Sequence, residues 1–255
     1  MSCFISDYDI TGKNTVALED SIMLKDQLVT AGSKILEGFI SPFSATVADR
    51  LVDNLYPIAG KTTMDEFGIP SIAADQKTVP GAIQAVANGA TEYALCNDIF
   101  GRYRRQAAEN GCCYIHPTYG TVSRFGLIPM VSSMDQIGVV CKNLPDGFTL
   151  LSHIAGKDPK DGAMFTEEHY SYTSAHQKIR VGIPGAVIQM ADPSHREAIE
   201  SFTAKFQTVD MTLEYFDSYK QVMYILSCAE ISNNINRYDG IKFGYRTPSF
   251  KGIND

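Results

Sequence analysis

The chain has 255 residues, of which 44% are hydrophobic and 20% charged, the balance of an ordinary globular protein with a substantial core. Its formal net charge of −7 and pI near 5.2 exclude a broad electrostatic hold on a phosphate backbone, so we expect no direct nucleic-acid binding. No apolar run approaches the ~20 residues that cross a bilayer, and the opening MSCFISDYDITGKN lacks the features of a secretory signal; we expect a cytoplasmic protein without membrane contact.

The first half of the chain alternates short β-rich runs with helical ones. The helix predicted at 44–56 begins with Ser44 as N-cap and places Val47, Leu51 and Leu55 on one face. Glycines close the later helices of this half, as is common just after a helix end. In chain order we predict a strand at 15–18, the helix at 44–56, a strand at 57–60, a helix at 81–89, a strand at 93–96, a helix at 101–111 and a strand at 112–115.

The second half continues the alternation. Pro184 and Gly185 end a strand at 179–183, and Asp192 and Pro193 are typical of a helix start. That helix carries an apolar stripe made of Ile199, Phe202 and Phe206. The remaining predicted elements are a strand at 136–141, a helix at 146–156 and a last long helix at 219–240.

This order of elements predicts the fold class. Strands that alternate with helices indicate an α/β protein with a mixed central β-sheet and helices on both faces. The sequence has neither a repeat nor a low-complexity linker, so we predict a single domain over residues 1–255.

Cysteine and histidine usage gives no sign of a disulfide framework or a metal site. The six cysteines are scattered, without C-x-x-C spacing, and we expect reduced thiols. The segment EEHYSYTSAHQ holds Glu167, Glu168, His169 and His176, but it is more typical of a polar connecting loop. We therefore expect neither a metal nor a cofactor. The cysteines are Cys3, Cys96, Cys112, Cys113, Cys141 and Cys228.

Four blocks, in the same order along the chain, resemble the amidase signature family, and in particular the A subunits of its glutamyl-tRNA(Gln)/aspartyl-tRNA(Asn) amidotransferases. In the third of these blocks, the resemblance implies that the serine pair and the Asp-Gln pair supply backbone hydrogen bonds near the core. The blocks are LEDSIMLKDQLVTAGSKILEGFISPFSATVADRL, GKTTMDEFGI, PTYGTVSRFGLIPMVSSMDQIG and AEISNNINRYDGIKFGYR.

The resemblance implies an amide-cleaving triad of a serine, a cis-serine and a lysine, in which a base activates a hydroxyl nucleophile. This chain departs from that pattern at each member. VALEDS places Glu19 where the family has the lysine, and CNDIFGRYR places Arg102 where the family has the nucleophilic serine. The segment VPGAIQAVANG runs on without the loop that bears the cis-serine. The family's leading helices and C-terminal region also lack counterparts, so we expect a trimmed core.

The resemblance therefore predicts a former active site without catalytic residues. A guanidinium neither attacks a carbonyl nor acts as a base at ordinary pH. We expect a vestigial pocket and consider two arrangements: a Glu19–Arg102 salt bridge that plugs the centre, or two side chains that point separately to solvent. The pocket residues are Glu19, Asp20, Asp98, Ile99, Phe100, Gly101, Arg102 and Arg104.

Three functional hypotheses follow. The first is an inert relative with a ligand-binding or protein-assembly role, as a homo-oligomer or with a protein partner, and with a small amide or carboxylate as its ligand. The second is an active enzyme: either an amidase that uses other residues, such as Cys96 or Cys112 with His116, or an enzyme with a carboxylate-based reaction from Glu19, Asp20 and Asp98. The third is an accessory component of a tRNA-dependent amidotransferase.

Overall fold

The computed structural model describes residues 3–70, 78–172, 179–241 and 244–252. The chain divides into two compact units, Met1–Tyr172 with Ala229–Asp255, and Thr173–Cys228. That the whole chain folds as a single domain stays a prediction.

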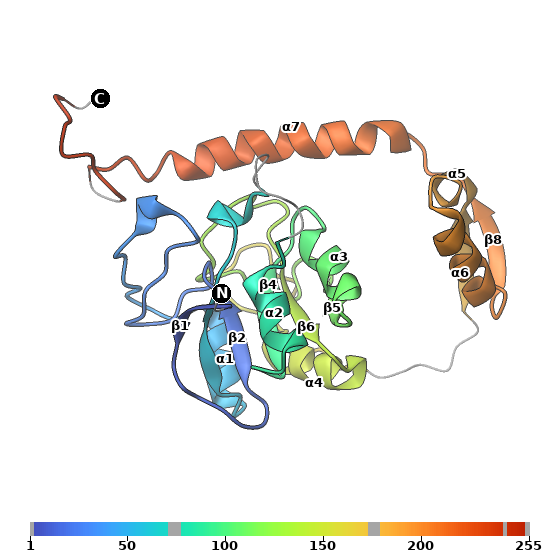
Figure 1. The fold of residues 1–255 in the computed structure, drawn as a ribbon, viewed down its shortest axis with the longest axis horizontal. Helices are drawn as coiled ribbons and strands as arrows, with labels where there is room; N and C mark the ends of the chain where they lie inside the picture. The colour runs from blue at the N-terminus through green and yellow to red at the C-terminus, as the bar shows by residue number, and fades with distance from the viewer. Residues whose placement is uncertain (1–2, 71–77, 173–178, 242–243, 253–255) are drawn as a thin grey trace. The chain divides into compact units, whose positions relative to one another are not determined.

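The first unit is built on a six-stranded mixed sheet with the strand order β1-β3-β2-β4-β6-β5 (Figure 1). Strands β2, β3 and β4 are parallel, whereas β1 pairs antiparallel with β3, and β6 pairs antiparallel with both β4 and β5. The mixed sheet confirms the predicted fold class. The strands are β1 (Phe4–Asp7), β2 (Val16–Glu19), β3 (Ile58–Thr62), β4 (Tyr93–Asn97), β5 (Cys113–Ile115) and β6 (Ile137–Cys141).

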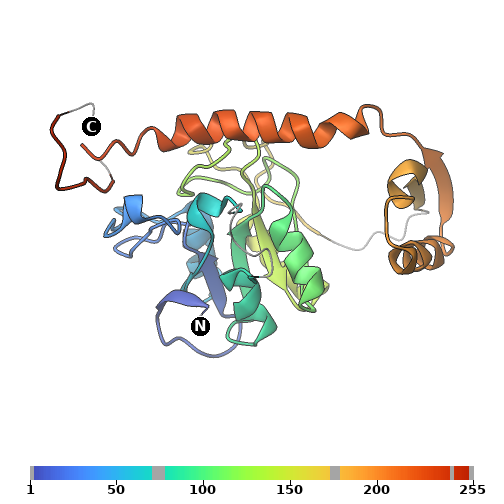
Figure 2. The same ribbon diagram turned by 45° about the horizontal axis from the view of Figure 1, so that its top comes forward.

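Helices cover both faces of this sheet. On one face, α1 (Thr46–Asp53) and α4 (Leu144–Ile154) pack against the strands, and on the other face α2 (Gly81–Ala87) and α3 (Arg102–Glu109) lie side by side (Figures 1 and 2). The described residues of this unit also form two short 3-10 turns, Lys34–Leu36 and Glu66–Gly68.

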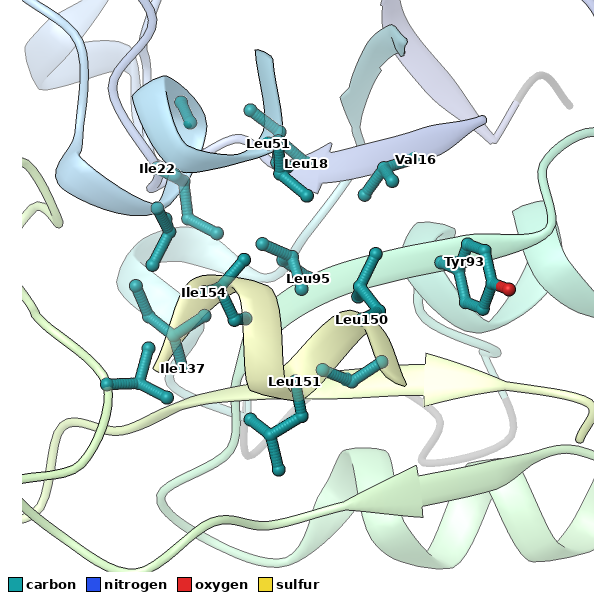
Figure 3. Packing of buried hydrophobic residues seen from close by; sticks show 14 of the residues in the cluster. Val16, Leu18, Ile22, Leu51, Tyr93, Leu95, Ile137, Leu150, Leu151 and Ile154 are labelled. Atoms are coloured by element: carbon teal, nitrogen blue, oxygen red, sulfur yellow. The ribbon is translucent and has the colours of Figure 1, made fainter. Parts of the chain in front are cut away.

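The core follows from the two-residue period of the buried strands. In β2, Val16 and Leu18 join the cluster under α1 and α4, while Ala17 between them joins the cluster under α2 and α3. Leu95 of β4 packs with the first cluster and is fully buried, as the close view in Figure 3 shows. Because every residue of β2 is buried, side chains at the end of this strand cannot reach bulk water.

Two local predictions in the α1 region are wrong. Ser44 does not cap the helix: Ala45 is the N-cap, and the Ser44 hydroxyl instead accepts the amide of Lys25. Leu55 lies beyond the end of α1 at a φ of 61° and is 84% exposed, so it leaves the apolar face. By contrast, Gly89 closes the α2 region at a φ of 74°, as predicted.

The second unit is small. It holds two parallel strands, β7 (Arg180–Pro184) and β8 (Gln207–Met211), with α5 (Gly185–Ile188) and α6 (Pro193–Thr203). The sequence predicted β7 and α6 but missed β8. Helix α7 (Phe216–Ile235) begins in this unit, and its residues from Ala229 onward belong to the first unit.

The helix start predicted at Asp192 and Pro193 is confirmed in position, although the Asp192 side chain makes no capping hydrogen bond. Phe206 lies after the end of α6 rather than on it, and its ring centroid is 5.3 Å from that of Phe202. Within the described part of the chain, no helix is both long and apolar enough to cross a membrane.

We expect Leu95→Ala to lower the free energy of unfolding by about 2–5 kcal/mol, because it leaves a cavity in the fully buried first cluster. Leu55→Ala is the matched control, and it should change stability by less than about 0.5 kcal/mol because Leu55 is exposed. Urea denaturation followed by circular dichroism measures both. Equal effects of the two substitutions would contradict this assignment of the core.

Candidate functional site

Glu19 is the last residue of β2, and its side chain is 1% exposed. The fold supplies this buried carboxylate with hydrogen-bond donors. The Ser21 hydroxyl donates to Oε1 at 2.6 Å, and the backbone N–H of Asn97 donates to Oε2 at 3.3 Å. The Tyr103 hydroxyl, from α3, is a further donor. A carboxylate with this many donors is a satisfied buried acceptor.

Burial dominates the electrostatics of Glu19. Desolvation raises the pKa of its carboxyl to about 7, the nearby charge of Asp98 adds to the rise, and the hydrogen bonds oppose it. Cys96 lies in the same interior, where burial and then the charges of Glu19 and Asp98 raise the pKa of its thiol well above the ordinary value. Its thiol therefore stays protonated at neutral pH and is a poor nucleophile.

Asp20, the next residue, faces Lys61, a buried lysine that was not among the predicted site residues. Lys61 of β3 is fully buried, with its Nζ 3.8 Å from Asp20 Oδ1, and it donates to the backbone oxygens of Asp20 and Ile22. Burial lowers the pKa of Lys61 to about 8, against the raising effect of Asp20 and Glu19. The other Asp20 oxygen accepts both the amide and the hydroxyl of Thr30. The only sequence signal was a lysine inside the apolar run IAGKT.

Asp98 organises the start of α3. Its carboxylate accepts the backbone N–H groups of Tyr103 at 3.3 Å and Arg104 at 3.1 Å, and also Arg104 Nε at 2.9 Å. Gly101 precedes the helix at a φ of 77°, which suits glycine. The structure thus joins two predicted site residues, Asp98 and Arg104. In addition, the Asp98 carboxylate accepts the backbone N–H groups at the N-terminus of α3, which an oxyanion could otherwise use.

The predicted Glu19–Arg102 salt bridge is wrong. Arg102 pairs with Asp65, and its Nη2 donates to the backbone oxygen of Thr78 at 2.7 Å. The alternative with both side chains in solvent is also wrong, because the Arg102 side chain is 10% exposed and Glu19 is buried. Successive helical residues point about 100° apart, so Tyr103, the neighbour of Arg102, reaches Glu19 instead.

The eight residues predicted to line one pocket fall into different surroundings. Phe100, Gly101 and Arg102 line a hollow of about 180 Å³ together with Pro70 and Arg105. Asp20 lines another hollow, of about 360 Å³, whose wall includes Thr30, Gly32, Lys34, Thr63 and Met64. Glu19, Asp98 and Ile99 are buried. The structure therefore does not bring the predicted set together as one cavity wall.

Of the Asp-Gln pair, the side chain of Asp135 serves the backbone, whereas Gln136 contributes only its own backbone N–H. Asp135 accepts the amides of Met130 at 3.0 Å and Val131 at 3.1 Å, and also Asn97 Nδ2 at 2.9 Å. Asn97 Oδ1 in turn accepts the amide of Gln136 at 2.8 Å. This network ties the end of β4 to the segment before β6.

Neither a thiol–imidazole pair nor a metal cluster is formed in the described part of the chain. His116 bonds the side chain of Gln136, and no hydrogen bond joins it to Cys96 or Cys112 among the side chains that the structure describes. The described residues hold no group of three or more His, Cys, Asp or Glu able to bind a metal ion. All six cysteines are free thiols, while His176 lies outside the described residues.

The mixed sheet with helices on both faces defines the class: an α/β protein. The family model described as Amidase matches residues 15–77 and 81–254, so the chain belongs to the Amidase family. A curated relative, the A subunit of glutamyl-tRNA(Gln) amidotransferase from Lachnoclostridium phytofermentans, is 35% identical over 266 residues. That match covers 94% of this chain and 54% of the relative, so the chain spans about half the length of the curated relatives it matches.

Solved structures show the same fold. The A subunit of glutamyl-tRNA(Gln) amidotransferase from Thermotoga maritima superposes with a TM-score of 0.77 at 24% identity, covering 91% of this chain and 59% of that one. A chain from a vestigial protein complex, whose structure bears on the origins of an s-triazine catabolic enzyme, gives a TM-score of 0.77 at 20% identity. It covers 89% of this chain and 55% of the other.

The pKa of Glu19 predicts a pH dependence of stability. Between the ordinary value of 4.5 and about 7, the folded protein keeps a proton that the unfolded chain has lost, so unfolding releases a proton. The free energy of unfolding should therefore fall as pH rises through this window, by roughly 3 kcal/mol from this group. Above this pH window, the contribution of Glu19 to the free energy of unfolding is fully lost.

Glu19→Gln should remove this slope, as measured by urea denaturation at intervals from pH 4.5 to 7.5. Glu109→Gln is the matched control, because Glu109 is exposed on α3. The same pH slope in Glu19→Gln and in the unaltered protein would contradict the assignment.

A double-mutant cycle checks the partner of Arg102. We expect Arg102→Ala and Asp65→Ala to show a coupling free energy of about 1–3 kcal/mol, because the two side chains form a partly buried ion pair. Arg102→Ala and Glu19→Gln should be additive within about 0.5 kcal/mol. Denaturation midpoints of the single and double variants give both values, and strong Glu19–Arg102 coupling would restore the plug hypothesis.

Proposed function

We propose that this chain is a catalytically inactive member of the Amidase family with a non-enzymatic, ligand-binding or protein-assembly role. One observation carries the proposal. At the position where the resemblance places the lysine base, Glu19 is buried, and its carboxylate is held by Ser21, Asn97 and Tyr103. These contacts make Glu19 a structural acceptor. The eight predicted pocket residues are, on this proposal, remnants of the former site.

The chemistry of the surrounding groups supports inactivity. Amide cleavage by this family's route needs a hydroxyl nucleophile activated by a base. Arg102 stands at the serine's position, and its guanidinium is engaged by Asp65 and Thr78. Lys61 is the nearest buried amine to Glu19 and Asp20, but it donates to the backbone oxygens of Asp20 and Ile22. The pKa of the Tyr103 hydroxyl is raised well above the ordinary value, so it is not an activated nucleophile.

An active amidase with non-standard residues is the second candidate, and the electrostatics of Glu19 favour it. A carboxyl whose pKa is raised to about 7 suits general acid–base catalysis near neutral pH. Against this candidate, Glu19 is 1% exposed, so a substrate has no access to it without local opening.

Assembly with a protein is the form that we propose for the non-enzymatic role. The curated relative is named as one component of an amidotransferase. We propose a homo-oligomer or a complex with a protein partner in the cytoplasm, including an accessory place beside a tRNA-dependent amidotransferase. The net charge of −7 argues that any such role proceeds through protein contact rather than through RNA.

The test is direct measurement of amide hydrolysis. We expect the purified protein to release no ammonia from glutamine, asparagine or simple primary amides, and to form no adduct with a fluorophosphonate probe in mass spectra. A full-length amidase run in parallel shows that the assay works. Turnover that disappears in Glu19→Gln would establish the second candidate, and a stoichiometric serine adduct would show a nucleophile that we have missed.

A further inference from the structure

The first unit contains a hollow of about 530 Å³ that is apart from the buried acids. It lies between the segment around residues 35–39 and the chain that follows α7. None of the predicted pocket residues lines it. Its volume is in the range of sites that hold small organic molecules.

The walls of this hollow are apolar. Met23, Leu36 and Ile128 present side chains that are 7%, 4% and 8% exposed, so they form a fixed floor rather than a loose surface. Phe39 adds a half-buried ring, and the ring of Tyr238 is stacked on Phe67 with the centroids 5.8 Å apart. Such a surface favours a ligand with an apolar body.

One cation on the rim is held in position. Arg237 donates through Nε to the backbone oxygen of Asn234 at 2.9 Å and through Nη2 to Asn234 Oδ1 at 3.0 Å. Asn234 is itself buried, and its Nδ2 donates to Met130 O at 2.9 Å and to Ser132 Oγ at 3.3 Å. No hydrogen bond from Arg237 Nη1 occurs among the described residues. A guanidinium anchored along one edge keeps its other donors for a planar anion.

We propose that this hollow binds an apolar molecule carrying a single carboxylate, with the carboxylate on Arg237 and the apolar body over Met23, Leu36 and Ile128. Glu37 also lines the hollow and limits the charge of the ligand. Its carboxylate repels a second negative charge, so a monocarboxylate is favoured over a dicarboxylate or a phosphate.

This inference deepens the proposed ligand-binding role by naming the ligand class and the site. It rests on that role but not on catalytic inactivity. Because the hollow shares no lining residue with the predicted pocket, binding and hydrolysis are measured independently. If no carboxylate binds, the proposal of catalytic inactivity is unaffected, and if hydrolysis is found, the binding inference is unaffected.

The experiment is isothermal titration of the full chain with decanoate and with 4-phenylbutyrate. We expect saturable binding of one molecule per chain, and at least tenfold weaker binding of the neutral matches decanol and 4-phenylbutanol. Arg237→Gln should weaken carboxylate binding about tenfold or more, and Glu37→Gln should tighten it by roughly two- to fivefold.

Arg105→Gln is the matched control, because it removes the same charge from an exposed α3 side chain that does not line this hollow. It should leave binding unchanged. Circular dichroism shows whether each variant is folded. If Arg237→Gln is not folded, tighter carboxylate binding by Glu37→Gln tests the proposal instead, and unchanged or weaker binding by that variant contradicts it. The proposal is overturned if neither carboxylate binds, if acid and alcohol bind equally, or if Arg105→Gln weakens binding as much as Arg237→Gln.

Discussion

The structure of the first unit depends on two adjacent carboxylates that strand β2 carries into the interior. Glu19 and Asp20 are each 1% exposed, and a buried carboxylate is costly unless it is hydrogen-bonded or neutralised. The surrounding elements meet that need in different ways. Glu19 receives neutral donors from the β2 end, β4 and α3, whereas Asp20 receives Thr30 and the ammonium of Lys61 from β3. The two acids therefore link strands, loop and helix of the first unit.

The fold relates this chain to its family. Amidase family membership is shown, and the fold superposes on that of relatives about twice its length. Within that fold, α3 begins with an acid-capped turn, since Asp98 holds the amides of Tyr103 and Arg104. Buried backbone groups need such networks in any fold, whether or not a reaction takes place. These networks therefore stabilise the fold whatever the chemistry of the site.

The sequence predicted most elements of the first unit because buried strands and amphipathic helices carry strong periodic signals. It failed where a choice depended on distant partners. Ser44 precedes α1 but accepts an amide from Lys25, and Arg102 pairs with Asp65 rather than with Glu19. A side chain's partner is set by the direction in which it leaves its helix and by which residues the fold places there, and neither is visible in a linear pattern.

By itself, the sequence determined the α/β class, the family and the chemical types at the triad positions, because residue identity and periodicity are properties of the chain. Tertiary structure alone decided that Glu19 is bonded by Tyr103, that Lys61 neutralises Asp20, and that Arg237 stands beside an apolar hollow. These facts join residues from distant positions in the chain, and burial then sets their pKa values. Tertiary packing brings these residues together and shifts their pKa values, and the order of residues along the chain does not encode that packing directly.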